Sequence, residues 1–474
     1  MKENEIPLGL AFDDALIIPM YSEVAPNDVD TKTKIAKELK INIPLASAAM
    51  ETVTESKLAI ALARQGGIGF LHACMSIEKQ TRETDKVKRS EHGIITDPFS
   101  LTPNNYVREA EALMARYRIS GVPITENKIL VGIITNRDIR FETNLNKKIY
   151  EVMTKENLVT APVGITLEEA REILRKSKHE KLPIVDERGR LRGLITVKDI
   201  NKSAMFPNSC KDESGRLRVG AAVGIDGDYI ERARALFETN ADVILIDAPR
   251  GHSRSLIEAL KTLRAELPSA QIIAGSVATP EGALALIEAG ADGIKIGAGA
   301  SSVSTTRIVT GVGVPQLSAI LNCAAVIKKT APHIPIIADG GIRHSGDITK
   351  AIAAGASACV LGNIFAGCDE SPSEIESYMG RQYKTYKRSE QYLEFTGGTS
   401  VPEGVEGRAA YRGSLKNMIS QLIGGLQIGM SYVGASTIRE LQEKARFIRE
   451  TSRGLAEGRP NHVDVTRDAP NYSE

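Results

Sequence analysis

The sequence predicts an α/β protein, built on a closed (β/α)8 barrel and carrying a second, inserted unit. Short apolar runs rich in β-branched residues recur with helical patterns between them, as in a parallel sheet covered by helices. One interval between runs is much longer than the others and contains an internal repeat. A chain of 474 residues can bury more than one core. We therefore expect a large domain and a smaller one.

Eight such runs are present, and eight strand and helix pairs are the number that closes a barrel of this type. In chain order, the runs are residues 43–50, 67–72, 218–224, 243–249, 271–279, 293–299, 334–342 and 359–363.

The runs end in Gly, Ala, Ser, Asp or His instead of continuing as apolar sequence. A single glycine in such a place is more simply explained by a turn of the chain. Because the feature repeats at most of the strand ends, it favours a ligand-binding face, which barrels place at the carboxyl ends of their strands.

The long interval, roughly residues 93–210, contains the repeat. Residues 121–124 leading to 131–139 recur as residues 182–185 leading to 192–200. This arrangement resembles a tandem pair of CBS domains. The predicted division is a barrel of residues 1–92 and 211–474, a first CBS domain of residues 93–150 and a second of residues 151–210.

Each repeat carries a T-x-x-D turn, Thr135 with Asp138 and Thr196 with Asp199. In CBS domains this turn presents a hydroxyl and a carboxylate to an adenine or guanine nucleotide, so the resemblance implies nucleotide binding at these four residues. The alternative is a helix start, because Thr followed three residues later by an acid caps a helix without any ligand. The sequence leaves both interpretations open.

Composition narrows the classes of partner. Lys and Arg number 60 against 59 Asp and Glu, which gives no bulk electrostatic reason to bind nucleic acid or a membrane surface. The five cysteines form no CxxC pair and no Cys/His cluster, so neither disulfides nor a metal site is predicted. No secretory pattern and no run of roughly 18 apolar residues is evident. We expect a cytoplasmic protein with small-molecule partners.

A series of motifs in one order covers essentially the whole chain and resembles the inosine monophosphate dehydrogenase and guanosine monophosphate reductase family. The resemblance implies a (β/α)8, or TIM, barrel with an inserted CBS pair, assembled as a tetramer or an octamer. The motifs are GLAFDDALIIP (9–19), SAAMETVTE (47–55), RQGGIGFLH (64–72), GRLRVGAAVG (215–224), AGSVAT (274–279), TTRIVTGVGVPQ (305–316), IIADGGIRHSGDITKA (336–351), VPEGVEGR (401–408) and GASTIRELQEKARFIRETS (434–452).

In that family, a cysteine thiolate on the loop after the sixth strand attacks C2 of the purine, and hydride passes to or from a nicotinamide. The family loop reads GxGPGSxCTTR, whereas residues 297–307 here place Ser304 at the cysteine position and keep Thr306. A serine hydroxyl is a weak nucleophile unless a base takes its proton. Cys323 lies in the following helical pattern and is expected to be a core residue.

The flap and the cofactor motif also depart from the family pattern. Tyr386 is followed by Lys-Arg-Ser-Glu where the family has a glycine-rich turn, and Gln391 and Tyr392 replace the family's Arg-Tyr pair. A glutamine cannot act as the base that activates water. Asp247 is kept in the motif that the family uses toward NAD or NADP.

The family's monovalent-cation loop is altered as well. Ala300 and Ser301 replace its Pro-Gly step, and residues 457–459 read Glu-Gly-Arg instead of Glu-Ser-His. Glycine reaches dihedral angles that serine resists. We therefore expect no potassium site.

The resemblance also implies contacts to a purine nucleoside monophosphate. The implied residues are Ser302, Gly341, Gly362 and Tyr386 at the phosphate, Asn363 in place of a family serine, Asp339 at the ribose and Glu403 at N1 of the base. Glycine leaves backbone amides open to a phosphate. Taken alone, Asp339 could cap a turn and Glu403 could be an exposed charge.

Two main hypotheses follow. The first is a purine nucleotide-binding, divergent or regulatory relative that does not run the ordinary cysteine-dependent reaction. The alternative is an active NAD(P)-dependent oxidoreductase with an unusual site, in which Thr306, Tyr392 and Asp247 supply polar groups. A nucleotide-storage or scaffolding protein is a third possibility.

Overall fold

The computed structural model divides the chain into two compact units. Unit 1 comprises Met1–Ser90, Asn208–Cys210 and Leu217–Glu474, and unit 2 comprises Glu91–Pro207 and Lys211–Arg216. The residues that the structure describes are 6–91, 98–117, 119–387, 394–396, 399–401, 403–461, 463, 465–466, 469 and 471–472.

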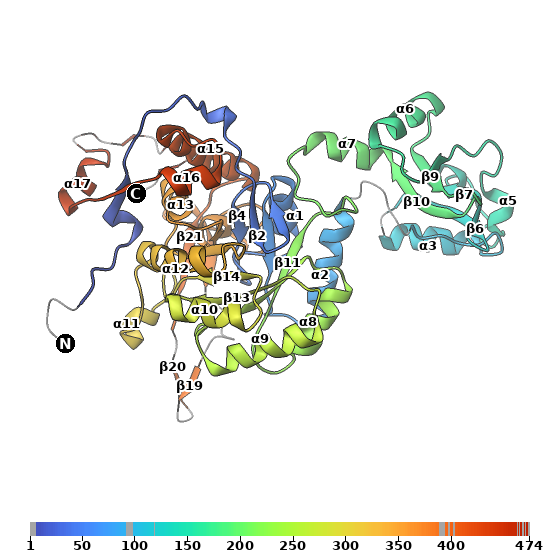
Figure 1. Ribbon diagram of the computed structural model, residues 1–474. Helices are drawn as coiled ribbons and strands as arrows, with labels where there is room; N and C mark the ends of the chain where they lie inside the picture. The colour runs from blue at the N-terminus through green and yellow to red at the C-terminus, as the bar shows by residue number, and fades with distance from the viewer. Residues whose placement is uncertain are drawn as a thin grey trace. The chain divides into compact units, whose positions relative to one another are not determined.

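Unit 1 is a closed barrel of parallel strands, which confirms the predicted fold class (Figure 1). Each strand comes from one of the eight predicted runs, and neighbours pair in the order β11-β12-β13-β14-β15-β16-β4-β5. The strands are β4 (Leu45–Ser47), β5 (Ile68–Leu71), β11 (Val219–Val223), β12 (Val243–Asp247), β13 (Ile272–Val277), β14 (Gly293–Ile296), β15 (Ile336–Asp339) and β16 (Ala358–Leu361).

A long helix follows each strand and covers the outside of the barrel. These helices are α1 (Ser56–Arg64), α2 (Ile77–Ser90), α8 (Tyr229–Glu238), α9 (Arg254–Glu266), α10 (Pro280–Glu288), α12 (Gln316–Thr330), α13 (Ser345–Ala353) and α15 (Leu415–Val433). Several start at a side-chain cap. The hydroxyl of Thr279, for example, accepts from Gly282 N at 3.2 Å, and Pro280 occupies the first turn, where its missing N–H costs nothing.

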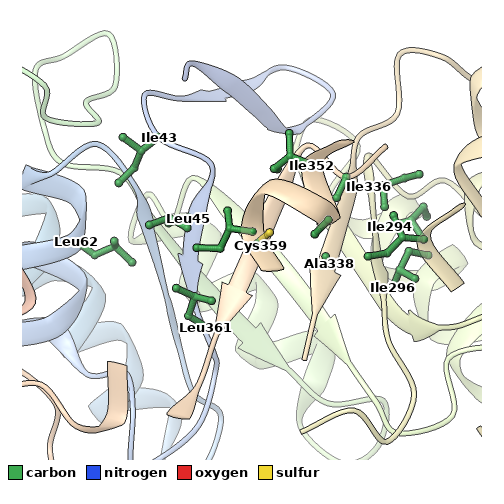
Figure 2. Packing of buried hydrophobic residues seen from close by; sticks show 14 of the residues in the cluster. Ile43, Leu45, Leu62, Ile294, Ile296, Ile336, Ala338, Ile352, Cys359 and Leu361 are labelled. Atoms are coloured by element: carbon green, nitrogen blue, oxygen red, sulfur yellow. The ribbon is translucent and has the colours of Figure 1, made fainter. Parts of the chain in front are cut away.

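Side chains along each strand point alternately to the outside and the inside of the barrel, and they form two separate hydrophobic cores. Leu45, Ile336 and Cys359 point outward and pack with helix residues such as Leu62 and Ile352 (Figure 2). Their neighbours in sequence point inward and fill the barrel interior, among them Ala46, Ile337 and Val360. Side chains of a strand alternate between its two faces, so a continuous apolar run serves both cores.

Two aspartates fix the amino ends of the strands. Asp242 Oδ2 accepts from Val219 N and from Lys88 Nζ, each at 2.8 Å. Asp292 Oδ2 likewise accepts from Ile272 N at 2.9 Å and pairs with Arg264. Each carboxylate therefore ties the start of one strand to a cation from the helical layer.

Shorter elements complete unit 1. The segment after β16 forms the antiparallel sheet β17-β18-β21, and β1 near the N-terminus pairs with β22 near the C-terminus. Their bounds are η2 (Phe12–Asp14), β1 (Ala15–Ile17), η3 (Pro26–Asp28), β2 (Thr33–Ala36), β3 (Leu39–Ile41), α11 (Thr306–Thr310), α14 (Asn363–Ala366), β17 (Ile375–Tyr378), β18 (Arg381–Lys387), β19 (Glu394–Thr396), β20 (Thr399–Val401), β21 (Glu406–Ala410), α16 (Ile438–Lys444), β22 (Phe447–Arg449) and α17 (Ser452–Glu457).

Unit 2 contains the internal repeat. Both copies form an antiparallel hairpin followed by a helix, β6-β7-α4 in the first and β9-β10-α7 in the second. Its elements are α3 (Val107–Tyr117), β6 (Gly121–Glu126), β7 (Ile129–Thr135), α4 (Asn136–Ile139), α5 (Ile149–Val152), β8 (Ala161–Pro162), α6 (Leu167–Ser177), β9 (Lys181–Val185), β10 (Leu191–Thr196) and α7 (Val197–Met205). Among the described residues of the whole chain, no helix is both long and apolar enough to span a bilayer.

Candidate functional site

A cavity of about 180 Å³ opens at the carboxyl ends of the barrel strands. Its lining comes from the ends of β12, β14, β15 and β16, the loop of residues 297–306, and Tyr386 of β18. The strand ends are small or polar here because the barrel presents them to the cavity and not to either core. Of the residues expected to bind substrate or cofactor, the cavity brings together Asp247, Ser302, Asp339, Gly341, Gly362, Asn363 and Tyr386.

One side of the cavity is built from glycine backbone and a tyrosine hydroxyl. Gly341 adopts a φ of 77°, and its N–H donates to Ala300 O at 2.8 Å, which joins the loop after β15 to the loop after β14. A Cβ on Gly362 would lie 2.5 Å from the Tyr386 hydroxyl, so glycine is required for that hydroxyl to approach. Tyr386 also hydrogen-bonds Ser301 at 3.3 Å.

Tyr386 remains a hydrogen-bond donor over the whole physiological range. Its side chain is buried, and burial raises the pKa of the phenol to about 12 although the bond to Ser301 opposes the shift. A neutral hydroxyl suits an anionic oxygen better than a phenolate would, because it can donate a hydrogen bond.

Three side chains form a hydrogen-bonded chain at the edge of the cavity. The Ser304 and Thr306 hydroxyl oxygens are 3.0 Å apart, and Thr306 Oγ1 donates to Glu403 Oε2 at 2.8 Å. Because Thr306 has one hydroxyl proton and gives it to Glu403, Ser304 is the donor in the first bond. Backbone bonds hold the pieces together, since Thr305 N donates to Glu403 O at 3.1 Å.

A buried lysine that the sequence interpretation missed lies at the cavity floor. Lys295 Nζ is 2.9 Å from Asp247 Oδ1 and also pairs with Asp339 Oδ2. Burial alone would lower the pKa of this ammonium, but the two carboxylates raise it above its usual range. A signal was present in the sequence, because Lys295 interrupts an apolar strand at an inward-facing position between Ile294 and Ile296.

No thiol stands in for the missing family cysteine among the described residues that line the cavity. Cys323 is fully buried in α12, and burial raises its pKa to about 12, as it does for Cys210 and Cys368. Such thiols are protonated at neutral pH and shielded from solvent, and neither property suits a nucleophile.

One carbonyl of the altered cation loop, that of Ala298, accepts a hydrogen bond from an arginine. Arg307 Nε donates to Ala298 O at 2.9 Å, and its terminal nitrogen donates to Val314 O at 2.6 Å. Within the described residues, no group of three or more His, Cys, Asp or Glu side chains could hold a metal ion.

The remaining predicted residues are the flap pair and the residues of the two T-x-x-D turns. Gln391 and Tyr392 lie outside the described residues. Thr135 N and Oγ1 both donate to Asp138 Oδ2 at 2.7 Å, at the start of α4. Thr196 ends β10, and Asp199 lies in α7 with its side chain outside the described part of the structure.

A separate open hollow of about 900 Å³ lies within unit 2. Both copies of the repeat contribute polar side chains to it, Ser120, Asn136 and Arg140 from the first and Lys198 from the second.

Comparisons with known proteins agree with the motif order. The profile of the IMP dehydrogenase / GMP reductase domain matches residues 9–462. Inosine-5′-monophosphate dehydrogenase of Aquifex aeolicus is 53% identical and aligns over 99% of both chains, and that of Bacillus subtilis is 53% identical over 98% of both. A solved structure of GMP reductase from Trypanosoma brucei with guanosine 5′-monophosphate is 39% identical, with a TM-score of 0.87 over 97% of this chain and 99% of that one. This chain therefore belongs to the IMP dehydrogenase / GMP reductase family.

Proposed function

We propose that the protein is an active oxidoreductase that takes a purine nucleoside 5′-monophosphate at the barrel mouth and NAD or NADP as its second substrate. The observation that carries the proposal is the chain of hydrogen bonds from Ser304 through Thr306 to Glu403. It leads from a hydroxyl in the cavity to a carboxylate, as an activated nucleophile requires.

We propose one orientation of the nucleotide in the cavity. Its phosphate would meet the backbone of Gly341 and Gly362 and the Tyr386 hydroxyl, its ribose would meet Asp339, and the edge of the base would face Glu403. The neutral phenol of Tyr386, which approaches closely because Gly362 has no side chain, supports this orientation. The similar GMP reductase structure contains guanosine 5′-monophosphate.

The proposed chemical step uses this order of protons. As Ser304 Oγ bonds to C2 of inosine monophosphate, its proton would pass to Thr306, Thr306 would pass its own proton to Glu403, and the C2 hydride would leave for the oxidised dinucleotide. Water would then displace Ser304 from C2 and release xanthosine monophosphate, with the proton on Glu403 returning through Thr306 to Ser304 and the second water proton going to solvent. The carboxylate thereby supplies the base that a serine needs and a cysteine thiolate does not.

We propose that a nicotinamide dinucleotide binds beside Asp247. One carboxylate oxygen is held by Lys295, and the other meets no donor within the described residues, so it can accept from an amide or a ribose hydroxyl. Bound there, the dinucleotide would accept or supply hydride.

The active oxidoreductase was the alternative of the two hypotheses drawn from the sequence. The sequence alone put the divergent or regulatory form first because Ser304 replaces the cysteine. The named relatives at 53% identity are dehydrogenases, which supports an active enzyme.

For unit 2 we propose the CBS pair that the repeat resembles, with its domains at residues 93–150 and 151–210 and an adenine or guanine nucleotide as ligand. The hollow lined by Arg140 and Lys198 offers positive charge for phosphates. A second T. brucei GMP reductase structure, 38% identical, contains guanosine 5′-triphosphate. A cytoplasmic homotetramer or octamer is part of the same proposal.

The test is turnover of inosine, guanosine and xanthosine monophosphates with oxidised and reduced NAD and NADP, followed by the absorbance of the reduced cofactor. Binding of the same nucleotides is measured by calorimetry. Turnover that is lost in Ser304→Ala while binding persists is the expected result. Tight binding without turnover of any pair would instead establish the divergent, non-catalytic form, and no binding would overturn both.

A further inference from the structure

Lys295 joins two carboxylates that serve different ligands in the proposed function. Asp247 ends β12, Lys295 lies in β14 and Asp339 ends β15. The lysine side chain is 5% exposed, against 19% for Asp247 and 27% for Asp339. The ammonium is thus buried, while both carboxylates remain open to the cavity.

The contact between Lys295 and Asp247 crosses an entire strand. β13 separates β12 from β14, and its residue Gly275 is in register with both Asp247 and Lys295. A Cβ on Gly275 would lie 2.7 Å from Lys295 Cβ and 2.5 Å from Lys295 O. The intervening strand therefore has no side chain at the one position where it would separate the cation from Asp247.

One positive charge is shared between two negative ones. If Asp247 lost its charge, the ammonium would pair with Asp339 alone, and its positive charge would no longer be divided between two carboxylates. Asp339 would then be a poorer acceptor for ribose hydroxyls, because a carboxylate oxygen already bound to a cation offers less charge to another donor.

We infer that Lys295 couples the two sides of the cavity, so that the affinity of Asp339 for a ribose depends on the charge of Asp247 on the other side. The inference rests on the proposed function, in which Asp339 receives the ribose. It makes Lys295 a positioning residue, since it acts through the two carboxylates.

The first experiment measures binding of inosine and guanosine 5′-monophosphates by calorimetry in Asp247→Asn. We expect affinity to fall about threefold to tenfold, the range typical of coupling between residues in one ion-pair network. This direction is informative, because removing a negative charge from the cavity would by itself strengthen binding of an anionic phosphate. Asp226→Asn is the matched control, because this substitution removes the same charge from an exposed residue just beyond β11. It should leave affinity for the nucleotide unchanged or slightly higher.

Two further measurements test whether Asp247→Asn acts on nucleotide binding through Lys295 and the ribose hydroxyls. The 2′,3′-dideoxy forms of the same nucleotides lack the ribose hydroxyls, and their affinity should not fall in Asp247→Asn. In a Lys295→Met background, the effect of Asp247→Asn on the normal nucleotides should shrink to less than about twofold. If Lys295→Met does not fold, the dideoxy comparison still decides the question.

The outcomes separate the inference from the proposed function. If the unaltered protein binds none of the nucleotides, the proposed function is wrong. If it binds them but Asp247→Asn leaves their affinity unchanged or raises it as Asp226→Asn does, the coupling is overturned while the nucleotide site stands. An equal loss for the dideoxy nucleotides would also overturn it.

Discussion

Thr306 donates its only hydroxyl proton to Glu403 Oε2, 2.8 Å away, so Ser304 is the donor in its own hydrogen bond to Thr306. Without the glutamate, Thr306 could donate to Ser304, and the serine proton would have no route to a base.

Glu403→Gln should lower turnover about 100-fold or more, since an amide cannot take the proton that Thr306 passes on. Binding of the nucleotide, measured by calorimetry, should change far less than turnover. Glu406→Gln is the matched control, because Glu406 is exposed on the adjacent β21. Equal turnover in both variants would show that Glu403 is not the base.

Ser304→Cys should raise turnover by about tenfold or more, because a thiol is the stronger nucleophile and needs less help from a base. Ser304→Cys should also make turnover less dependent on Glu403. The measurement is the factor by which Glu403→Gln lowers turnover in Ser304→Cys, compared with the same factor in the unaltered protein. A cysteine variant slower than the unaltered protein would contradict a nucleophilic role at this position.

Gly362→Ala should weaken nucleotide binding about tenfold or more, because the new methyl group would collide with the Tyr386 hydroxyl at 2.5 Å. Gly424→Ala in α15 has open space around its new methyl group and should be neutral for binding. It should also raise stability by up to about 1 kcal/mol, since alanine favours a helix over glycine. Calorimetry and urea unfolding check the two effects, and similar binding losses in both variants would count against a phosphate site at Gly362.

Asp242→Asn should lower the free energy of unfolding by about 3 kcal/mol, because it removes the carboxylate that lies 2.8 Å from the buried Lys88 ammonium. The exposed pair of Arg234 and Glu266 provides the comparison, and Glu266→Gln should cost less than about 1 kcal/mol. Both values come from urea unfolding. Equal costs would mean that burial does not decide the strength of these pairs.

Local pattern was enough to predict the barrel. Seven of the eight strands lie inside the predicted runs, and β16 begins one residue before its run, at Ala358. Alternating burial on two faces makes each strand continuously apolar, and each run ends where the strand meets the cavity. Cys323 was also placed correctly in a helix, where it is fully buried.

The site could be predicted only as a list of residues. Motif positions named Ser304, Thr306 and Glu403, but no spacing along the chain shows that a threonine hydroxyl lies between a serine and a glutamate 97 residues further on. The role of Lys295 was not predicted either. In the sequence, a lysine within an apolar run could equally mark the end of a strand, and its two aspartate partners lie far away along the chain.

The sequence by itself determined the barrel, the repeat and the residue types at the strand ends, because periodicity and turn chemistry are properties of neighbouring residues. Only the tertiary structure decided which polar groups meet. Closing the barrel brings the ends of β12, β14 and β15 around one cavity, and hydrogen-bond direction and charge sharing depend on distances of 2.5–3 Å that separate segments of chain reach only in the folded state.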